Sequence, residues 1–124
     1  NCASTSKLAT SGEKFVKLIL EQQNWTIVAT NLRRPGFELD LVACKGQTLA
    51  VIEVKTRRRR IATLAESSLL LPYGKSQALR RGVAYLIESN WIPSHVKTIR
   101  IDLALVTGQP QSFCFEYFAN AVVI

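Results

Sequence analysis

One segment, residues 36–56, constrains the fold more than any other part of the chain. It reads GFELDLVACKGQTLAVIEVKT, two apolar runs joined by the turn-forming stretch CKGQ. Two strand-like runs separated by a short turn that contains glycine predict a β-hairpin. We therefore expect a β-sheet with this hairpin as part of it.

Strand-like and helical segments surround the hairpin. Apolar residues recur at helical spacing over residues 7–23 and again over residues 75–89. Residues 25–33 (WTIVATNLR) predict a strand before the hairpin, and residues 97–106 (KTIRIDLALV) predict another after the second helix. Residues 112–118 (SFCFEYF) fit a last strand at the sheet edge.

The order of these elements predicts an α/β fold, with a central mixed β-sheet flanked by helices. The strand that follows the second helix can lie parallel to an earlier strand, as right-handed crossovers prefer. Residues 57–72 show no clear period, so we expect a mobile connection there, with a short helix or strand turn as the alternative. We expect residues 1–124 to form a single domain.

Composition narrows the class of partner. The chain has 16 Lys and Arg against 9 Asp and Glu, a formal charge of +7, which favours a polyanion. Nucleic acid is the first candidate and an anionic membrane surface the second, and a merely basic, soluble chain fits the charge equally well. No apolar run is long enough to span a membrane and no signal-peptide pattern is seen, so we expect a cytoplasmic protein that does not bind membranes.

Cysteine and histidine are too few for a soft-metal site. The three cysteines are far apart without a CxxC pair, and His95 is the single histidine, which excludes a zinc module. Cys44 and Cys114 lie in apolar stretches, where we expect them to be small core residues.

Acidic residues interrupt both arms of the hairpin. Side chains alternate along a strand, so Glu38 and Asp40 share one face of the first arm, while Glu53 and Lys55 share one face of the second. Burial of neighbouring carboxylates is costly unless a cation compensates. Two readings follow: an ion pair of Lys55 with Glu53 or Asp40, or a divalent metal ion.

An acid on the first helix, Glu13, enlarges this set and favours the metal. Carboxylates without His or Cys suit Mg²⁺ or Mn²⁺, which commonly also bind phosphate oxygens. Such an ion polarises a phosphodiester, and a neighbouring lysine stabilises the charge that develops. We expect Glu53 to hold the metal and Lys55 to face the scissile phosphate.

The motifs also resemble a known family. The stretches GEKFVKLILEQQNW, NLRRPGFELDLV, VIEVKTR, GKSQALRRGVAYLI and IRIDLAL are similar, in this order, to the motifs of the YraN-like family of endonuclease-related proteins. The resemblance covers Gly12 to about Val106. It implies a PD-(D/E)xK restriction-endonuclease-like fold, similar to that of archaeal Holliday-junction resolvases.

The resemblance also implies roles for individual residues. Asp40, Glu53 and Lys55 would form the nuclease core, with Glu13 completing the acidic cluster, so that Glu13, Asp40 and Glu53 bind Mg²⁺ or Mn²⁺. Phe37 stands where the family's acidic motif has glycine, which places a bulky ring beside the site.

Basic residues near these motifs are candidates for phosphate contacts. The arginine run directly after the catalytic strand would emerge beside the metal, where it contacts phosphates on either side of the cut or else forms a solvated loop. We expect Lys75 to be an auxiliary substrate contact, and Asp102 to be structural, paired with Arg100. The candidate nucleic-acid-binding residues are Arg33, Arg34, Arg57, Arg58, Arg59, Arg60, Lys75, Arg80 and Arg81.

Three hypotheses for function follow. The first is a metal-dependent DNA endonuclease that cleaves phosphodiester bonds, with branched DNA such as a Holliday junction as one candidate substrate. The alternatives are a catalytically inactive nucleic-acid-binding module with a nuclease fold, and a scaffold whose acids are merely ion-paired. The complete set of Glu13, Asp40, Glu53 and Lys55 favours the first. The sequence leaves open whether two copies form a homodimer.

Overall fold

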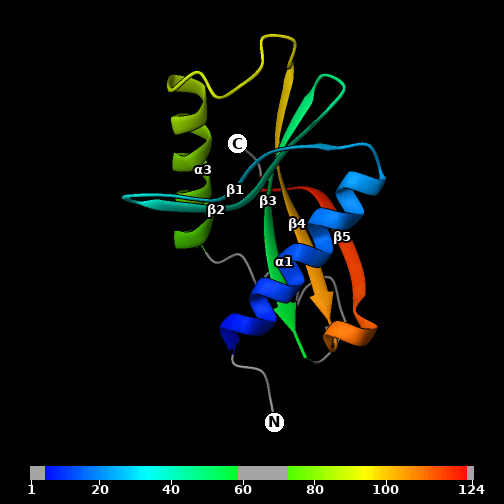
Figure 1. Cartoon of the computed structure of the whole chain (residues 1–124). Helices are drawn as coiled ribbons and strands as arrows, with labels where there is room; N and C mark the ends of the chain where they lie inside the picture. The colour runs from blue at the N-terminus through cyan, green and yellow to red at the C-terminus, as the bar shows by residue number, and fades with distance from the viewer. Residues whose placement is uncertain (1–4, 59–72, 123–124) are drawn as a thin grey trace.

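A five-stranded mixed β-sheet forms the centre of the molecule, in the order β1-β2-β3-β4-β5 (Figure 1). The computed structural model describes residues 5–58 and 73–122. The elements, labelled as in Figure 1, are α1 (Thr5–Gln22), β1 (Thr26–Arg34), β2 (Phe37–Lys45), β3 (Thr48–Arg57), α3 (Tyr73–Glu88), β4 (Thr98–Thr107), the 3₁₀ turn η1 (Pro110–Ser112) and β5 (Cys114–Val122).

The strand pairing agrees with the expected mixed sheet. β1, β2 and β3 form an antiparallel meander, β4 runs parallel to β3, and β5 returns antiparallel at the edge. The turn of the β2–β3 hairpin contains Gly46 at φ 59°, a left-handed conformation that glycine adopts without strain. Both helices and all five strands expected from the sequence are present, and the last strand extends to Val122.

Two apolar cores, one on each face of the sheet, hold the layers together. The core on one face contains Leu79, Val83 and Leu86 of α3, and the core on the other contains Val16 and Leu20 of α1 (Figure 1). Because helices cover both faces, β3 and β4 are buried through most of their length. Each fully buried Leu or Val contributes roughly 1.5–3 kcal/mol to stability.

A glycine sets how closely α1 approaches the sheet. Gly12 lies against Thr56 of β3, and a Cβ atom added at Gly12 would come within 2.0 Å of the Thr56 Oγ1. No larger residue fits there without a shift of the helix. This close approach brings the next residue, Glu13, to the C-terminal half of β3.

The hairpin strands separate at the point where the acidic residues begin. Pairing of β2 with β3 runs from Lys45↔Thr48 to Leu41↔Ile52 and extends no further toward the β2 start. Beyond it, the Val54 backbone N–H donates to the Asp40 carboxylate at 2.9 Å. A side chain thus replaces the backbone acceptor, which leaves room for acidic groups between the strands.

The two cysteines expected in the core differ in their exposure. Cys44 is buried, as expected, but Cys114 is exposed, because it begins the edge strand β5. The expectation of a core position for Cys114 was wrong.

The expected mobile connection over residues 57–72 falls largely outside the described residues. β3 continues through Arg57, while residues 59–72 are not described. In the described parts of the chain, neither helix has the length and apolar character needed to cross a membrane.

Candidate active site

Glu53 is the most deeply buried acid of the candidate site. It lies on β3 with 2% of its surface exposed. Two ammonium groups approach one of its oxygens, Oε2: Lys55 Nζ at 3.1 Å and Lys75 Nζ at 3.4 Å. The other oxygen, Oε1, is buried without a hydrogen-bond partner in the described part of the chain. A buried carboxylate oxygen without a donor is rare, so this atom is available to a cation or to a protonated neighbour.

Asp40 is the second acid, brought to Glu53 from the neighbouring strand. It is 8% exposed and accepts the Val54 N–H described above. Burial and the nearby Glu53 charge raise the pKa of Asp40 to about 8, against the smaller opposing effect of the Val54 hydrogen bond. At neutral pH Asp40 therefore holds a proton, which it can share with Glu53. The expected meeting of acids from adjacent strands is what the structure shows.

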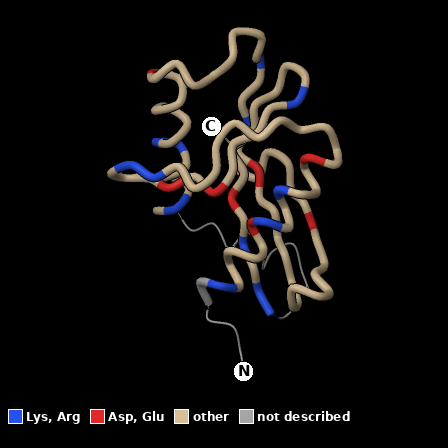
Figure 2. Tube along the Cα trace, in the orientation of Figure 1, with Lys and Arg blue, Asp and Glu red and all other residues tan. Residues whose placement is uncertain are grey.

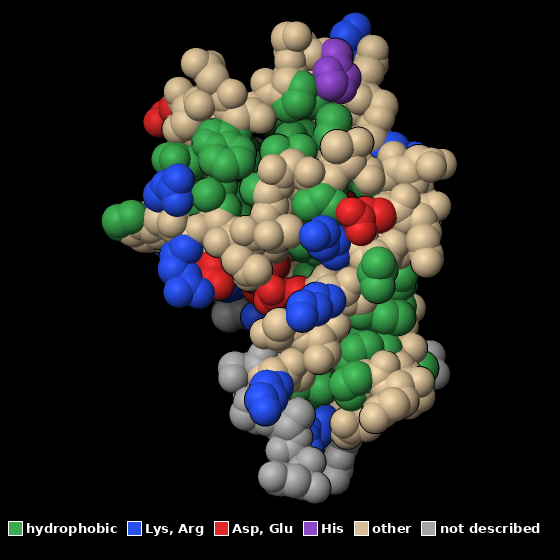
Figure 3. All heavy atoms as spheres, in the orientation of Figure 1, with side chains coloured by type: hydrophobic (Ala, Val, Ile, Leu, Met, Phe, Trp, Pro, Cys, Tyr) green, Lys and Arg blue, Asp and Glu red, His purple; other side chains and the backbone are tan. Residues whose placement is uncertain are grey.

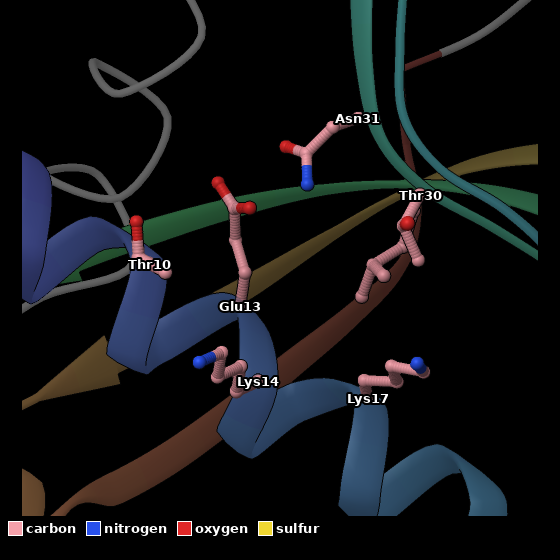
Figure 4. Close-up of a pocket in the computed structure, with 7 residues that line it drawn as sticks. Thr10, Glu13, Lys14, Lys17, Thr30 and Asn31 are labelled. Atoms are coloured by element: carbon pink, nitrogen blue, oxygen red, sulfur yellow. The ribbon is translucent and has the colours of Figure 1, made fainter.

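Glu13 lies beside this pair without joining it. Its carboxylate turns toward the Asn31 side chain of β1 (Figure 4). Partial burial raises the pKa of Glu13, the charges of Glu38 and Glu53 add to the rise, and the Asn31 hydrogen bond opposes it. Figure 2 shows several acidic positions near the middle of the trace, with basic positions around them, while other acidic positions lie toward its edges.

The donor set fits a divalent cation in part. Asp40 and Glu53 supply hard oxygen ligands. Among the described residues, no group donates a hydrogen bond to Glu53 Oε1, so this oxygen could coordinate a cation. Within residues 5–58 and 73–122, however, no three Asp, Glu, His or Cys side chains are placed to hold one metal ion together. A metal held by Asp40 and Glu53 would need Glu13 to turn from Asn31, or water to complete its coordination.

Comparison with known proteins places the chain in a family. Residues 12–106 match the model of the family described as "Uncharacterised protein family UPF0102". The chain belongs to the UPF0102 family. The expected resemblance to the YraN-like proteins is thereby confirmed.

UPF0102 relatives match over nearly the full chain. A UPF0102 protein of Bacteroides thetaiotaomicron is 30% identical over 120 residues, which cover 96% of this chain and 94% of the relative. Another from Alkaliphilus metalliredigens is 37% identical over 118 residues, with 94% and 98% covered. A third, from Geobacter sulfurreducens, is 27% identical, with 92% and 87% covered.

Some of the candidate nucleic-acid-binding residues of this UPF0102 chain flank the β1–β2 turn. Arg33 pairs with Glu38 at 3.0 Å, on the surface. Arg34 donates to the Tyr85 hydroxyl at 3.1 Å and lies over the Tyr85 ring, and Arg81 donates to the Gly36 carbonyl at 2.9 Å. These contacts fix the basic groups to the turn.

The other candidates are less closely grouped. Arg80 donates to the Gln77 side chain at 2.6 Å. Arg57 and Arg58 are exposed at the end of β3, and Arg57 donates to the Thr56 carbonyl at 3.0 Å. Arg59 and Arg60 lie outside the described residues. The candidate basic residues therefore form at least two groups, one at the β1–β2 turn with α3 and one at the end of β3.

Two further residues from the sequence motifs, Phe37 and Asp102, have packing and hydrogen-bonding roles. The Phe37 ring packs against Tyr85, with ring centroids 5.3 Å apart, and is half-buried beside the α3 core. Asp102 is fully buried and accepts hydrogen bonds from Arg100, the Tyr117 hydroxyl and the Asn120 N–H. Asp102 is therefore a structural residue that ties β4 to β5, as expected.

The structure adds residues that the motif analysis passed over. A hollow of about 180 Å³ beside the acids is lined by Thr10, Glu13, Lys14, Lys17, Thr30, Asn31 and Leu41 (Figure 4). Asn31 adopts φ 50°, a conformation that asparagine tolerates better than most residues. A helical-wheel reading of the first helix would have found Lys14 and Lys17, because both lie on the side of α1 that carries Glu13.

Proposed function

We propose that this UPF0102 protein is a divalent-metal-dependent nuclease that cleaves phosphodiester bonds in DNA. One observation carries the proposal: two buried carboxyl groups, Asp40 and Glu53, meet from adjacent strands with the Lys55 ammonium 3.1 Å from Glu53. A raised pKa at Asp40, together with the charge partners of Glu53, is typical of a functional site rather than of a sheet interior.

Each residue has a role in this proposal. Asp40 and Glu53 hold a Mg²⁺ or Mn²⁺ ion, and Asp40 releases its proton when the ion binds. When bound there, such an ion would supply Lewis-acid activation of the phosphodiester and of the attacking water. Lys55 then stabilises the negative charge that develops at the phosphate, and Lys75 contacts the substrate from α3. Glu13 approaches from α1 to complete the acidic cluster.

The fold supports the same reaction class. A mixed sheet that opens between β2 and β3, with an acid on each strand and a lysine two residues on, is compatible with a PD-(D/E)xK restriction-endonuclease-like fold. Fold alone never fixes function, so the acidic pair and Lys55 carry the argument. The relatives are bacterial proteins, and bacterial chromosomal DNA is cytoplasmic, so we place the activity in the cytoplasm.

One observation favours a second candidate, a catalytically silent nucleic-acid-binding module. Lys55 and Lys75 both pair with Glu53, so the site is already neutralised without a metal. Removal of a partner from a buried ion pair leaves an unmatched charge, so these three residues can also be kept for a purely structural role. The two candidates differ in what Lys55 does.

Replacement of Lys55 by alanine separates them. The charge that Lys55 stabilises exists only in the transition state, whereas metal and DNA also bind in the ground state. We therefore expect Lys55→Ala to reduce cleavage on the order of a hundredfold or more, with DNA affinity largely retained. The assay measures Mn²⁺-dependent cleavage of branched, nicked and linear DNA. Lys45→Ala, an exposed lysine at the far end of the same hairpin, is the matched control.

The contrary result is specific. A wild-type protein that cleaves none of these substrates in Mn²⁺, with a Lys55→Ala variant that loses only stability, makes Lys55 a structural partner of Glu53. The binding-module reading would then replace the nuclease.

A further inference from the structure

One face of α1 carries a row of basic and hydroxyl side chains that the cleavage chemistry leaves unused. Lys7, Thr10, Lys14 and Lys17 fall within an arc of about 80°, because an α-helix turns 100° per residue. From the first to the last, the row extends about 15 Å along the helix. We call these four residues the α1 track.

The surface along the α1 track is hollowed. The hollow of about 180 Å³ beside Glu13 includes Thr10, Lys14 and Lys17 in its lining. A second hollow, of about 320 Å³, is lined by Lys7, Thr10, Ser11 and Lys14. Thr10 and Lys14 belong to both, so the two hollows adjoin one another. Figure 3 shows basic side chains spaced along this side of the molecule, with acidic groups beside them.

The track passes the proposed cleavage site, because Glu13 lies between Thr10 and Lys14 on α1. Glu13 lines the first hollow, and its charge interacts with both Glu53 and Asp40. In the described part of the chain, neither Lys14 nor Lys17 forms an ion pair. Their ammonium groups are therefore available to an anion that lies next to the acidic pair.

The chemistry of the lining identifies the class of ligand. Ammonium, hydroxyl and amide groups are donors to phosphate oxygens, and among the described residues no aromatic ring lines either hollow to stack on a base. The Lys14 and Lys17 side chains extend in different directions along the helix rather than toward one point (Figure 4). Such an arrangement suits successive phosphates of a strand better than a single phosphate ion.

We propose that the α1 track binds the sugar–phosphate backbone of the DNA strand that carries the scissile phosphate, independently of base sequence. The inference rests on the proposed nuclease function for its choice of ligand. It gives the substrate a direction across the molecule, parallel to α1 and past the acidic pair near Glu13.

A pair of charge-matched double variants tests the track. Lys14→Gln/Lys17→Gln removes two charges from the track, and Lys45→Gln/Lys97→Gln removes two from exposed positions elsewhere. Binding to a fluorescent DNA duplex is measured by anisotropy in EDTA, over a series of salt concentrations. Each lost phosphate contact lowers the slope of log K against log salt by about one, so we expect the track variant to lose about two. The control should keep the wild-type slope.

Binding and cleavage are scored separately, which keeps the two proposals distinguishable. Equal slopes for the two double variants, or a wild type that binds no DNA in EDTA, would overturn the track. If the track variant loses slope as expected but the wild type cleaves nothing in Mn²⁺, the track stands and the nuclease proposal fails. Thermal unfolding of both variants at the wild-type temperature confirms that neither has lost its fold.

Discussion

Asp40 lies in an environment that is unusual for an aspartate. It is nearly buried, and it lies beside a second buried acid, Glu53. Both effects disfavour its charged form, so its pKa rises to about 8. The folded protein therefore binds a proton at Asp40 that the unfolded chain, with an ordinary aspartate pKa, releases.

This difference predicts how stability changes with pH in the absence of metal. Between about pH 4 and pH 8 the folded state holds the proton and the unfolded state does not, so stability falls as pH rises. One such group costs at most about 1.4 kcal/mol per pH unit in that window. Asn at position 40 has no proton to lose and can still accept from Val54. We therefore expect Asp40→Asn to gain stability relative to the wild type as pH rises, measured by urea unfolding in EDTA.

A matched variant isolates the effect. Glu116→Gln also removes one carboxylate, but from an exposed position on β5, and should run parallel to the wild type across the same pH range. A constant difference between Asp40→Asn and the wild type from pH 4 to pH 8 would show that Asp40 is charged in the folded state at pH 7.

Much of the site was predictable at this scale, because a strand repeats every two residues. The spacing of Glu53 and Lys55, and an acid on the preceding strand, were sufficient to expect these side chains together. Asn31 was not assigned a role, since its contact with Glu13 joins β1 to α1 and has no local signal. The pairing of Lys75 with Glu53 likewise depends on how α3 lies on the sheet.

At the scale of elements, the position of α1 decides whether Glu13 reaches the site. Gly12 allows the helix to approach β3, and Thr56 is a β-branched residue with little freedom to move aside. A methyl group at position 12 would push the helix outward or strain Thr56.

We expect Gly12→Ala to destabilise the protein by up to about 2 kcal/mol in urea unfolding. Overpacking costs roughly 1–3 kcal/mol, and the better helix propensity of alanine returns about 1 kcal/mol. Gly74→Ala in α3 is the control, because none of the described residues outside its own helix turn comes within 4 Å of a Cβ at that position. The double variant Gly12→Ala/Thr56→Ala should recover part of the loss. Equal stability of Gly12→Ala and Gly74→Ala would mean that Thr56 does not set the helix position.

The elements themselves were largely predictable, and the separation of two strands was not. The spacing of apolar residues located both helices and all five strands, because the buried face of a helix and that of a strand each repeat with a characteristic period. It did not show that β2 leaves β3 at Asp40. Leu39 and Val42 pack in the same core although strict alternation would place them on opposite faces. The break coincides with the hydrogen bond from Val54 to Asp40, a contact between strands that no pattern within one strand could show.

At the scale of the whole molecule, the site links elements that are far apart in the chain. Glu13, Asp40, Glu53 and Lys75 belong to α1, β2, β3 and α3. These positions are close together only in the folded protein, so a ligand of the site binds the folded state and stabilises the entire domain. The surrounding charge of +7 also favours an anionic substrate once the acids are matched by a cation.

The last prediction follows from this linkage. At a Mn²⁺ concentration about 100 times its dissociation constant, binding adds about 2.7 kcal/mol to stability. For a chain of 124 residues this raises the unfolding temperature on the order of 10 °C. Asp40→Asn should lose the shift because a ligand is removed, while the exposed Glu116→Gln should keep it. The shift should also grow from pH 6 to pH 8, because the metal displaces the Asp40 proton. An unfolding temperature that saturating Mn²⁺ leaves unchanged at pH 8 would contradict a metal site at Asp40 and Glu53. The ion pairs of Glu53 with Lys55 and Lys75 would then be the interactions that compensate for the burial of the acids.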